Sequence, residues 1–386
     1  LLYRDLDKWS QITGDYPKLQ SELNGDPVTM GYRPAFYLIE NNNVIIVVSY
    51  VYPGSPAEEA GLKRGNIILS IDNKQLDTTN YQDLYSGTSY QVQLGAVVGN
   101  SLVYTGESLN MTARTTMTDP AIYHQLFEQE GHKIGYLVYV EFIKGPNEMF
   151  LRQLDNIFDE FKAEGVSDLI IDLRYNPGGE LDATIHLASL IAPAAVATGN
   201  ETLVNLNYNY DLQQYMEQNN HDDLLSHKFK NTASNIGLTR VCFLTTSASA
   251  SASELVIIGL DPYMEVILVG EPTYGKYTGA WVIPDENMKW AIMPIVSKFS
   301  NSAGFTDFSD GLIPDYQIDD DLFSAVPFGD LSDPMVAKAL EQLTGIPPAT
   351  PKKSAAPGLH LYKKIIPPQQ SIRNNLILPQ PGMKLK

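Results

Sequence analysis

The sequence lacks the features that mark several large protein classes. Its 386 residues include a single cysteine, Cys242, so no disulfide can form within the chain. No apolar run approaches the roughly 20 residues that a membrane-spanning helix needs. Lysine and arginine number 27 against 45 aspartate and glutamate residues, which gives a net charge of −18. That excess of negative charge argues against nucleic acid and against an anionic membrane surface as partners.

The sequence also shows no metal-binding motif and no internal repeat. The six histidines show no metal-ligand spacing, no internal repeat is visible, and nothing indicates a cofactor. Hydrophobic residues make up 44% of the chain, which is typical of a globular protein. A chain of this length is expected to form two or three domains with ample cores, and Cys242 is expected to pack inside one of them.

Two short apolar runs in the second half predict a β-α-β unit. Residues 240–245 and 265–270 are rich in β-formers and read as buried strands, and residues 253–260 between them read as a helix. Strands joined in this way are parallel and usually neighbours. The segments that follow the two strands should therefore meet at the carboxyl edge of a sheet, where sites in such sheets form.

A third segment is expected at the same edge. Residues 167–173 read as another buried strand, and a loop with two adjacent glycines, Gly178 and Gly179, follows it before a helix over residues 182–191. Paired glycines permit backbone conformations that expose N–H groups. An oxyanion hole requires such groups.

The segments after the two strands carry a candidate nucleophile and a candidate base. Ser251 lies in a serine- and alanine-rich turn, and Lys276 follows 25 positions later in a glycine-containing loop. A lysine can deprotonate a serine if its own proton is removed, which near pH 7 needs a downward pKa shift of roughly 3 units. Spacing alone leaves four candidates for the nucleophile, namely Ser247, Ser249, Ser251 and Ser253.

These segments together resemble peptidase family S41, the carboxyl-terminal processing peptidases with a serine–lysine dyad. The resemblance covers roughly residues 130–345 and rests on segments 172–179, 249–254, 270–276, 311–315 and 333–343. It selects Ser251 as the nucleophile and Lys276 as the base. It also implies that the backbone of Ala252 and of Gly178 or Gly179 supplies the oxyanion donors.

One position departs from the family pattern. Relatives usually carry a glutamine four residues after the lysine, where it orients the amine, and this chain has Ala280. Glu254 is interpreted as a favourable first-turn charge, and Asp172 with Arg174 as an ion pair that braces the glycine loop. A Ser-His-Asp mechanism is the weaker chemical alternative, since His186 sits within a predicted helix.

The region before this core resembles a PDZ domain. A β-prone run at residues 44–51 precedes Ser-Pro-Ala, Ala-Gly-Leu and Gly-Asn-Ile-Ile motifs within residues 55–68. PDZ domains bind an extended peptide by strand addition and hold its terminal carboxylate on backbone N–H groups. The corresponding loop is placed at residues 31–36, before the first strand, with Gly31, Tyr32 and Phe36 as the candidate binding residues. The alternative is that this region merely packs on the core.

Four regions are expected along the chain. Residues 1–27 are a lead that is helical around residues 5–13, residues 28–115 the PDZ-like domain and residues 116–345 the protease core. Within the core, a strand is expected at residues 134–142, a helix at 147–163 and an irregular insertion at 199–237. Residues 346–386 form a Pro/Lys-rich tail that cannot build a core alone, and is either disordered or draped over another surface. The predicted fold class is mixed α/β, with β-α-β units, a partly parallel sheet and the PDZ-like domain.

The expected function is that of a serine endopeptidase acting on protein or peptide substrates recognised at free C-termini. The alternative is a peptide-binding or scaffolding protein that kept the fold and lost turnover, which Ala280 favours. The sequence is compatible with a homo-oligomer as well as with a monomer. The chain begins at Leu1 without a signal-like segment, and a periplasmic or otherwise extracytoplasmic location is implied by the resemblance alone.

Overall fold

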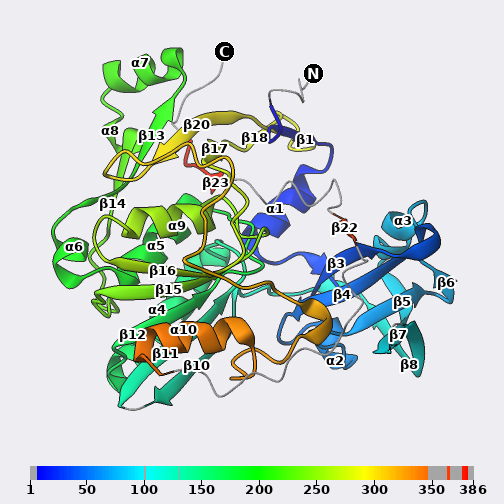
Figure 1. Ribbon diagram of the computed structural model, residues 1–386. Helices are drawn as coiled ribbons and strands as arrows, with labels where there is room; N and C mark the ends of the chain where they lie inside the picture. Colours follow the sequence, from blue (N-terminus) through cyan, green and yellow to red (C-terminus); the bar gives the residue numbers. More distant parts are fainter. Residues whose placement is uncertain (1–6, 100, 130, 347–362, 366–375, 381–386) are drawn as a thin grey trace.

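A computed structural model describes residues 7–99, 101–129, 131–346, 363–365 and 376–380. Figure 1 shows a layered α/β part and a β-rich part side by side, with helix α1 (Tyr16–Asn24) between them. The α/β part contains the segments predicted to form the site. The β-rich part contains the PDZ-like motifs.

The α/β part is built on a six-stranded sheet. In spatial order its strands are β10 (Ala121–Gln129), β11 (His132–Tyr139), β12 (Asp168–Asp172), β15 (Arg240–Thr245), β16 (Glu265–Gly270) and β21 (Tyr316–Gln317). Strand β10 is antiparallel to β11, and the other neighbours are parallel. The predicted β-α-β unit is therefore confirmed, and the three predicted site segments follow adjacent strands β12, β15 and β16.

Helices cover both faces of this sheet, as side-chain alternation along the strands requires. Odd-numbered residues such as Ile171 and Phe243 pack into one core, and their neighbours Ile170 and Cys242 pack into another on the opposite face. The first core is closed by α4 (Met149–Glu164), α5 (Leu181–Ile191) and α9 (Ala252–Leu260), and the second by α10 (Pro334–Thr344). Cys242 is fully buried, which confirms the packing role predicted for it.

A second sheet was not anticipated from the sequence. Its strands in order are β14 (Ser226–Lys228), β13 (Thr202–Tyr208), β20 (Ile295–Ser300), β17 (Thr278–Ala280) and β23 (Leu376–Ile377). The expectation of an irregular segment at residues 199–237 is wrong, because these residues also form α7 (Tyr210–Gln218) and α8 (Asp222–Leu225). Leu203, Val204 and Leu206 of β13 are buried in the first core, so the apolar residues of this mostly polar segment pack against helices and strands elsewhere in the chain.

The β-rich part is a seven-stranded sheet with two short helices. Its strands are β22 (Lys363–Ile365), β3 (Tyr32–Leu38), β4 (Val44–Val51), β5 (Ile67–Ile71), β7 (Ser89–Val98) and β8 (Ser101–Thr112), with β6 (Lys74–Gln75) paired to β5; the helices are α2 (Pro56–Glu59) and α3 (Tyr81–Tyr85). The run at residues 44–51 forms β4 as predicted. Ile45 and Val47 of β4 share a core with α10, so the two parts of the molecule are packed together.

The N-terminal lead is not helical where expected. Residues Gln11–Thr13 form β1, and the helix begins at Tyr16, after Asp15 accepts a hydrogen bond from the Lys18 N–H as its N-cap. The remaining elements are short: α6 (Ala194–Thr198), β2 (Val28–Thr29), β9 (Arg114–Thr115), β18 (Ile283–Pro284), β19 (Ala291–Met293) and the 3-10 helices η1 (Glu40–Asn42), η2 (Pro146–Glu148) and η3 (Leu322–Ser324). Strand β1 pairs with β19, and Trp9, just before β1, lies beside Lys276 of the predicted site.

Candidate active site

Ser251 occupies a sharp turn between β15 and α9. Its backbone has φ 59° and ψ −106°, a conformation that costs energy for a residue with a side chain and that is concentrated at functional sites. The side chain is fully buried. A Cβ on Gly178 would lie 2.9 Å from Ser251 Cβ, so only glycine allows the two loops to approach this closely.

The four serines of this turn differ in what their hydroxyl groups contact. Ser249 donates to the Leu173 carbonyl at 2.7 Å and Ser253 to the Asn176 carbonyl at 2.9 Å, so both tie the turn to the glycine loop. Ser247 is exposed. The Ser251 hydroxyl is buried and makes no hydrogen bond within the described chain. The structure thus offers a physical ground for distinguishing Ser251 from the other three.

Lys276 is completely buried, although lysine is rarely so. Burial lowers the pKa of its ammonium group from 10.5 to about 7, against the opposing effect of Glu254 and Asp7. The Lys276 Nζ also lies 5.9 Å from the centre of the Trp9 ring. This shift has the size that the sequence analysis required of a base that works near neutral pH.

Glu254 connects the two loops, a role that sequence reasoning missed. Its carboxylate accepts from the backbone N–H groups of Ser251 at 2.7 Å and Lys276 at 2.9 Å, both on Oε2, and from Gly275 N–H and the Thr273 hydroxyl on Oε1. Burial raises its pKa to about 7 despite these bonds, which favour the ionised form. One buried carboxylate therefore holds the backbones of both candidate catalytic residues in fixed relation.

A sequence signal for this role existed. A serine followed three positions later by glutamate is a capping box, in which the glutamate reaches back to the N-cap N–H. That pattern predicts the contact between Glu254 and Ser251. The contacts of Glu254 with residues 273–276 are not marked by a local pattern, because that loop comes to lie beside Glu254 only in the folded chain.

The glycine loop is anchored by a buried ionic cluster. Arg174 donates to Asp172 at 2.7 Å, to Asp333 at 2.8 Å and to Asp320 at 3.2 Å, and its side chain is only 1% exposed. The expected ion pair between Asp172 and Arg174 is thus present. Arg64, from the loop after α2, lies 3.6 Å from Asp320 and joins the β-rich part to this cluster.

The two glycines of the loop are not equivalent as oxyanion donors. The Gly178 N–H donates to Asn176 Oδ1 at 2.9 Å, so it is engaged within the loop in this conformation. Gly178 and Gly179 have φ values of 113° and 140°, which strain any residue with a side chain. A Cβ on Gly179 would lie 2.1 Å from the Phe142 carbonyl oxygen.

The predicted peptide-binding loop of the β-rich part is only partly where we expected it. Tyr32 and Phe36 lie within strand β3 rather than in a loop before it. Gly31 does precede the strand, at φ 83°, and its N–H donates to Thr29 Oγ1 at 3.0 Å. The boundary was wrong because residues 32–38 pair with β4 along their whole length.

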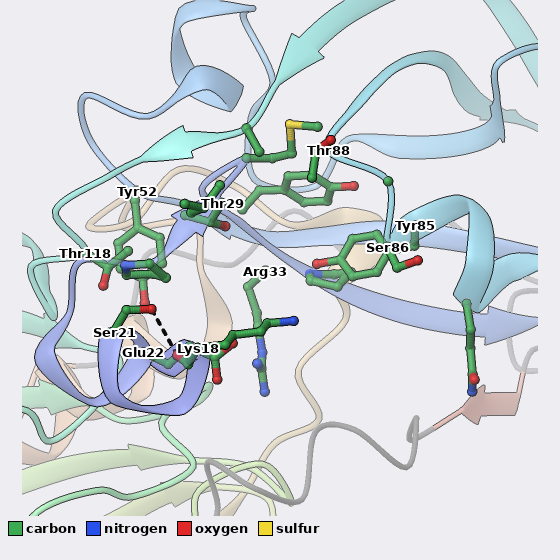
Figure 2. A pocket seen from close by; sticks show the side chains of 18 of the residues that line it. Lys18, Ser21, Glu22, Thr29, Arg33, Tyr52, Tyr85, Ser86, Thr88 and Thr118 are labelled. Carbon is green, nitrogen blue, oxygen red and sulfur yellow. Dashed lines mark hydrogen bonds between the residues drawn. The ribbon is translucent and has the colours of Figure 1, made fainter. Parts of the chain in front are cut away.

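A pocket of about 850 Å³ opens beside this strand. Figure 2 shows Lys18, Ser21 and Glu22 of α1 on one side of it and Tyr85, Ser86 and Thr88 on the other, with Arg33 between. Tyr32 and Phe36 also line the pocket, packed edge-to-face against Tyr85. An aromatic groove between strand β3 and helix α3 is a surface that can take an extended peptide.

Neither a metal nor a membrane span is indicated by the part of the chain that the structure describes. Within it, no three histidine, cysteine, aspartate or glutamate side chains are grouped as metal ligands. No described helix is both long enough and apolar enough to cross a bilayer.

His186, the base of the alternative triad, is hydrogen-bonded to Asp155 of α4 at 2.8 Å.

Comparison with known proteins identifies both parts. Residues 133–318 match the model of peptidase family S41, and residues 47–91 match that of the PDZ domain. The carboxyl-terminal-processing protease of Picosynechococcus sp. is 26% identical over 329 residues, which is 84% of this chain and 71% of that protein. The chloroplastic C-terminal processing peptidase of Tetradesmus obliquus is 24% identical and covers 71% of this chain and 57% of its own length.

A solved structure supports the same assignment across nearly the whole fold. A Bacteroides fragilis protein, described as a “putative S41 protease”, superposes with a TM-score of 0.73 at 28% identity, and the match covers 89% of this chain and 88% of that one. The matched S41 region contains the loops of Ser251 and Lys276, and the matched PDZ region contains β5 and the second part of β4. Residues 133–318 therefore form a peptidase family S41 domain, and a PDZ domain lies ahead of it in the chain.

Proposed function

We propose that this protein is a serine endopeptidase in which Ser251 is the nucleophile and Lys276 the general base. The observation that carries the proposal is a buried lysine with a pKa of about 7 whose backbone N–H binds the same carboxylate as the backbone N–H of Ser251, a strained serine whose hydroxyl makes no hydrogen bond in the described part of the chain. Burial of a lysine side chain destabilises a fold, so a fully buried lysine needs a functional reason.

The chemistry is acyl transfer in two stages. Neutral Lys276 takes the proton of the Ser251 hydroxyl while Oγ attacks the peptide carbonyl, and the protonated lysine then gives that proton to the departing amine. A water molecule then attacks the resulting ester while Lys276 accepts its proton, and Lys276 returns that proton to Ser251 Oγ as the bond between the acyl carbon and Oγ breaks. For the developing oxyanion we propose the backbone N–H groups of Ala252 and Gly179, because Gly178 donates to Asn176.

Glu254 takes the positioning role that the family glutamine would have. Ala280 is buried in β17 and has no side chain with which to hold an amine. Glu254 instead fixes the Lys276 backbone and favours the protonated amine electrostatically. Burial lowers the pKa of Lys276 and the Glu254 carboxylate raises it, so the pKa stays near neutrality.

We further propose that the PDZ domain recognises the C-terminus of a protein or peptide substrate. The aromatic groove beside β3 and the names of the relatives, which are processing proteases, support this role. The same resemblance, including a chloroplastic relative, supports a periplasmic or otherwise extracytoplasmic location, which cell fractionation would test.

The test compares hydrolysis of an unfolded protein by the parent, Ser251→Ala and Lys276→Ala. We expect both variants to lose at least about 10³-fold in kcat/KM, the range seen when a nucleophile or its base is removed. Full activity in both variants would remove the dyad from consideration. Thermal denaturation of each variant shows whether a loss reflects misfolding.

One observation favours a second function, that of a peptide-binding protein without turnover. The Ser251 hydroxyl makes no hydrogen bond in the described chain, and Ala280 replaces the family glutamine. Hydrogen bonds between catalytic groups often form only when substrate is bound, so this geometry does not exclude catalysis. Binding of C-terminal peptides without a covalent Ser251 adduct would support the second function, and an adduct would exclude it.

A further inference from the structure

Two short strands from the C-terminal segment of the chain lie against peptide-binding surfaces. Strand β22 pairs with β3 at the edge of the PDZ domain, and β23 pairs with β17 beside the peptidase site (Figure 1). The Pro/Lys-rich composition predicted that this segment cannot build a core of its own. Within it, residues 363–365 and 376–377 pair with strands of two sheets formed by earlier parts of the chain.

Strand β23 fills a slot between the oxyanion loop and the strand that follows Lys276. The Ile377 N–H donates to the Gly179 carbonyl at 2.9 Å, and the Leu378 N–H donates to the Ala280 carbonyl at 3.0 Å. Ile377 also bridges to Glu180 in a parallel sense. An extended segment is thus hydrogen-bonded on both sides by the walls of the candidate active site.

The side chains of this segment fit the slot. Leu376 is fully buried and Leu378 is 3% exposed, whereas Pro379 and Gln380 after them are exposed. Residues two apart in an extended chain point to one face, so the slot accepts an apolar side chain at every second position. A Cβ on Gly279 would lie 2.6 Å from Leu378 Cδ1, so a glycine in β17 makes room for this leucine.

Strand β22 occupies the edge to which a PDZ ligand adds. It runs antiparallel to β3, with Lys363 opposite Leu38 and Ile365 opposite Phe36. Strand addition of this kind is how PDZ domains hold an extended peptide. Ile365 packs against the same cluster of apolar side chains that contains Phe36, beside the aromatic pocket.

We propose that the C-terminal segment is a built-in competitor that occupies the PDZ edge and the active-site slot, and that substrates must displace it. The inference rests on the proposed peptidase function, since it concerns the same site. It also assigns a substrate class: extended peptides with apolar side chains at alternate positions. A tethered segment has an effective concentration of about millimolar, so weak strand pairing is enough for it to compete with dilute substrate.

The test displaces β23 by charge. Leu376→Asp places a carboxylate at a fully buried apolar position, where it is strongly disfavoured, and Pro379→Asp adds the same charge at an exposed position as the matched control. We expect kcat/KM for an unfolded protein substrate to rise about tenfold in Leu376→Asp, because the site is then free in most molecules. Pro379→Asp should match the parent, and both should melt within a few degrees of it.

A second variant and a binding assay separate this proposal from the proposed function. Ile365→Pro disrupts strand pairing at the PDZ edge and should also raise activity. A fluorescein-labelled peptide of residues 360–380 should bind Leu376→Asp more tightly than the parent and should inhibit it competitively. If the labelled peptide binds as expected but no variant hydrolyses substrate, the proposal that the C-terminal segment competes for the site stands and the proposal of peptidase activity is overturned.

Three results would overturn the competitor instead. Activity that is equal in the parent and Leu376→Asp would show that β23 does not block substrate. Loss of activity together with a fall in melting temperature in Leu376→Asp would show that β23 is a structural wall of the site. Equal binding of the labelled peptide to the parent and to Leu376→Asp would show that the slot is not where the segment competes.

Discussion

Replacing Lys276 by methionine should stabilise the protein while abolishing its catalysis. The lysine pKa falls from 10.5 in water to about 7 in the fold because the side chain is fully buried. Each pKa unit corresponds to about 1.36 kcal/mol, so at pH 7 the shift costs the folded state about 4 kcal/mol. Methionine has a similar volume and no charge, so it removes this cost without opening a large cavity.

The stabilisation expected from Lys276→Met depends on pH. The folded-state pKa is lowered, so between pH 7 and pH 10.5 the unfolded chain binds more protons than the folded one, and the parent gains stability as the pH rises. The advantage of Lys276→Met should therefore be greatest at and below pH 7 and should disappear as the pH approaches 10.5. Urea denaturation at pH 7 and pH 10 measures both values.

The control is Lys228→Met, which removes a lysine from the exposed face of β14. Surface substitutions of this kind usually change the free energy of unfolding by no more than about 0.5 kcal/mol. If Lys276→Met were less stable than the parent at pH 7, or if its advantage were the same at pH 7 and pH 10, the buried neutral amine would be the wrong description of Lys276.

Three further predictions concern the residues that hold the site. Glu254→Gln keeps the size of the side chain but replaces one acceptor oxygen by an amide group, which cannot accept hydrogen bonds from the converging N–H groups. We therefore expect kcat/KM to fall about 10-fold to 100-fold in Glu254→Gln and less in Glu254→Asp. Steady-state kinetics, with circular dichroism to check folding, measures this, and unchanged kinetics in Glu254→Gln would contradict it. Arg174→Met leaves the carboxylates of Asp172 and Asp333 buried without their partner and should lower the free energy of unfolding by about 3–5 kcal/mol; a urea midpoint close to that of the parent would refute the bracing role. Gly178→Ala would place a methyl group 2.9 Å from Ser251 Cβ at a φ of 113°, so activity should be lost and the melting temperature reduced, and an active, equally stable variant would show that the two loops are not in close contact.

The parts of the site that could be predicted from the sequence depend on short-range patterns. The strands before Ser251 and before Lys276 are compact apolar runs, and their connection through one helix fixes them as parallel neighbours, as β15 and β16 prove to be. A base that works near neutral pH requires a desolvated lysine, and the burial of Lys276 that meets this requirement is seen only in the structure. The choice of Ser251 among four serines came from the family resemblance, and the structure adds that Ser249 and Ser253 have backbone partners.

The parts that could not be predicted depend on contacts between distant segments. Glu254 was interpreted as a helix-start charge because its other partners lie about 20 positions away in a loop without regular structure. Strands β22 and β23 are two or three residues long and pair with β3 and β17, so no local pattern marks them. Helix α1 was placed too early, although Asp15 and the αL glycine Gly25 bound it in the expected way.

The most direct test of the account is covalent labelling of Ser251 by a small serine-reactive probe as a function of pH. We predict an adduct on Ser251 alone, formed faster as the pH rises, with an apparent pKa of about 7 that reports Lys276. The rate should be greater in Leu376→Asp than in the parent and lost in Lys276→Met. Labelling at another residue, no adduct on Ser251 in either the parent or Leu376→Asp, or a rate in Lys276→Met equal to that of the parent would contradict the serine–lysine site.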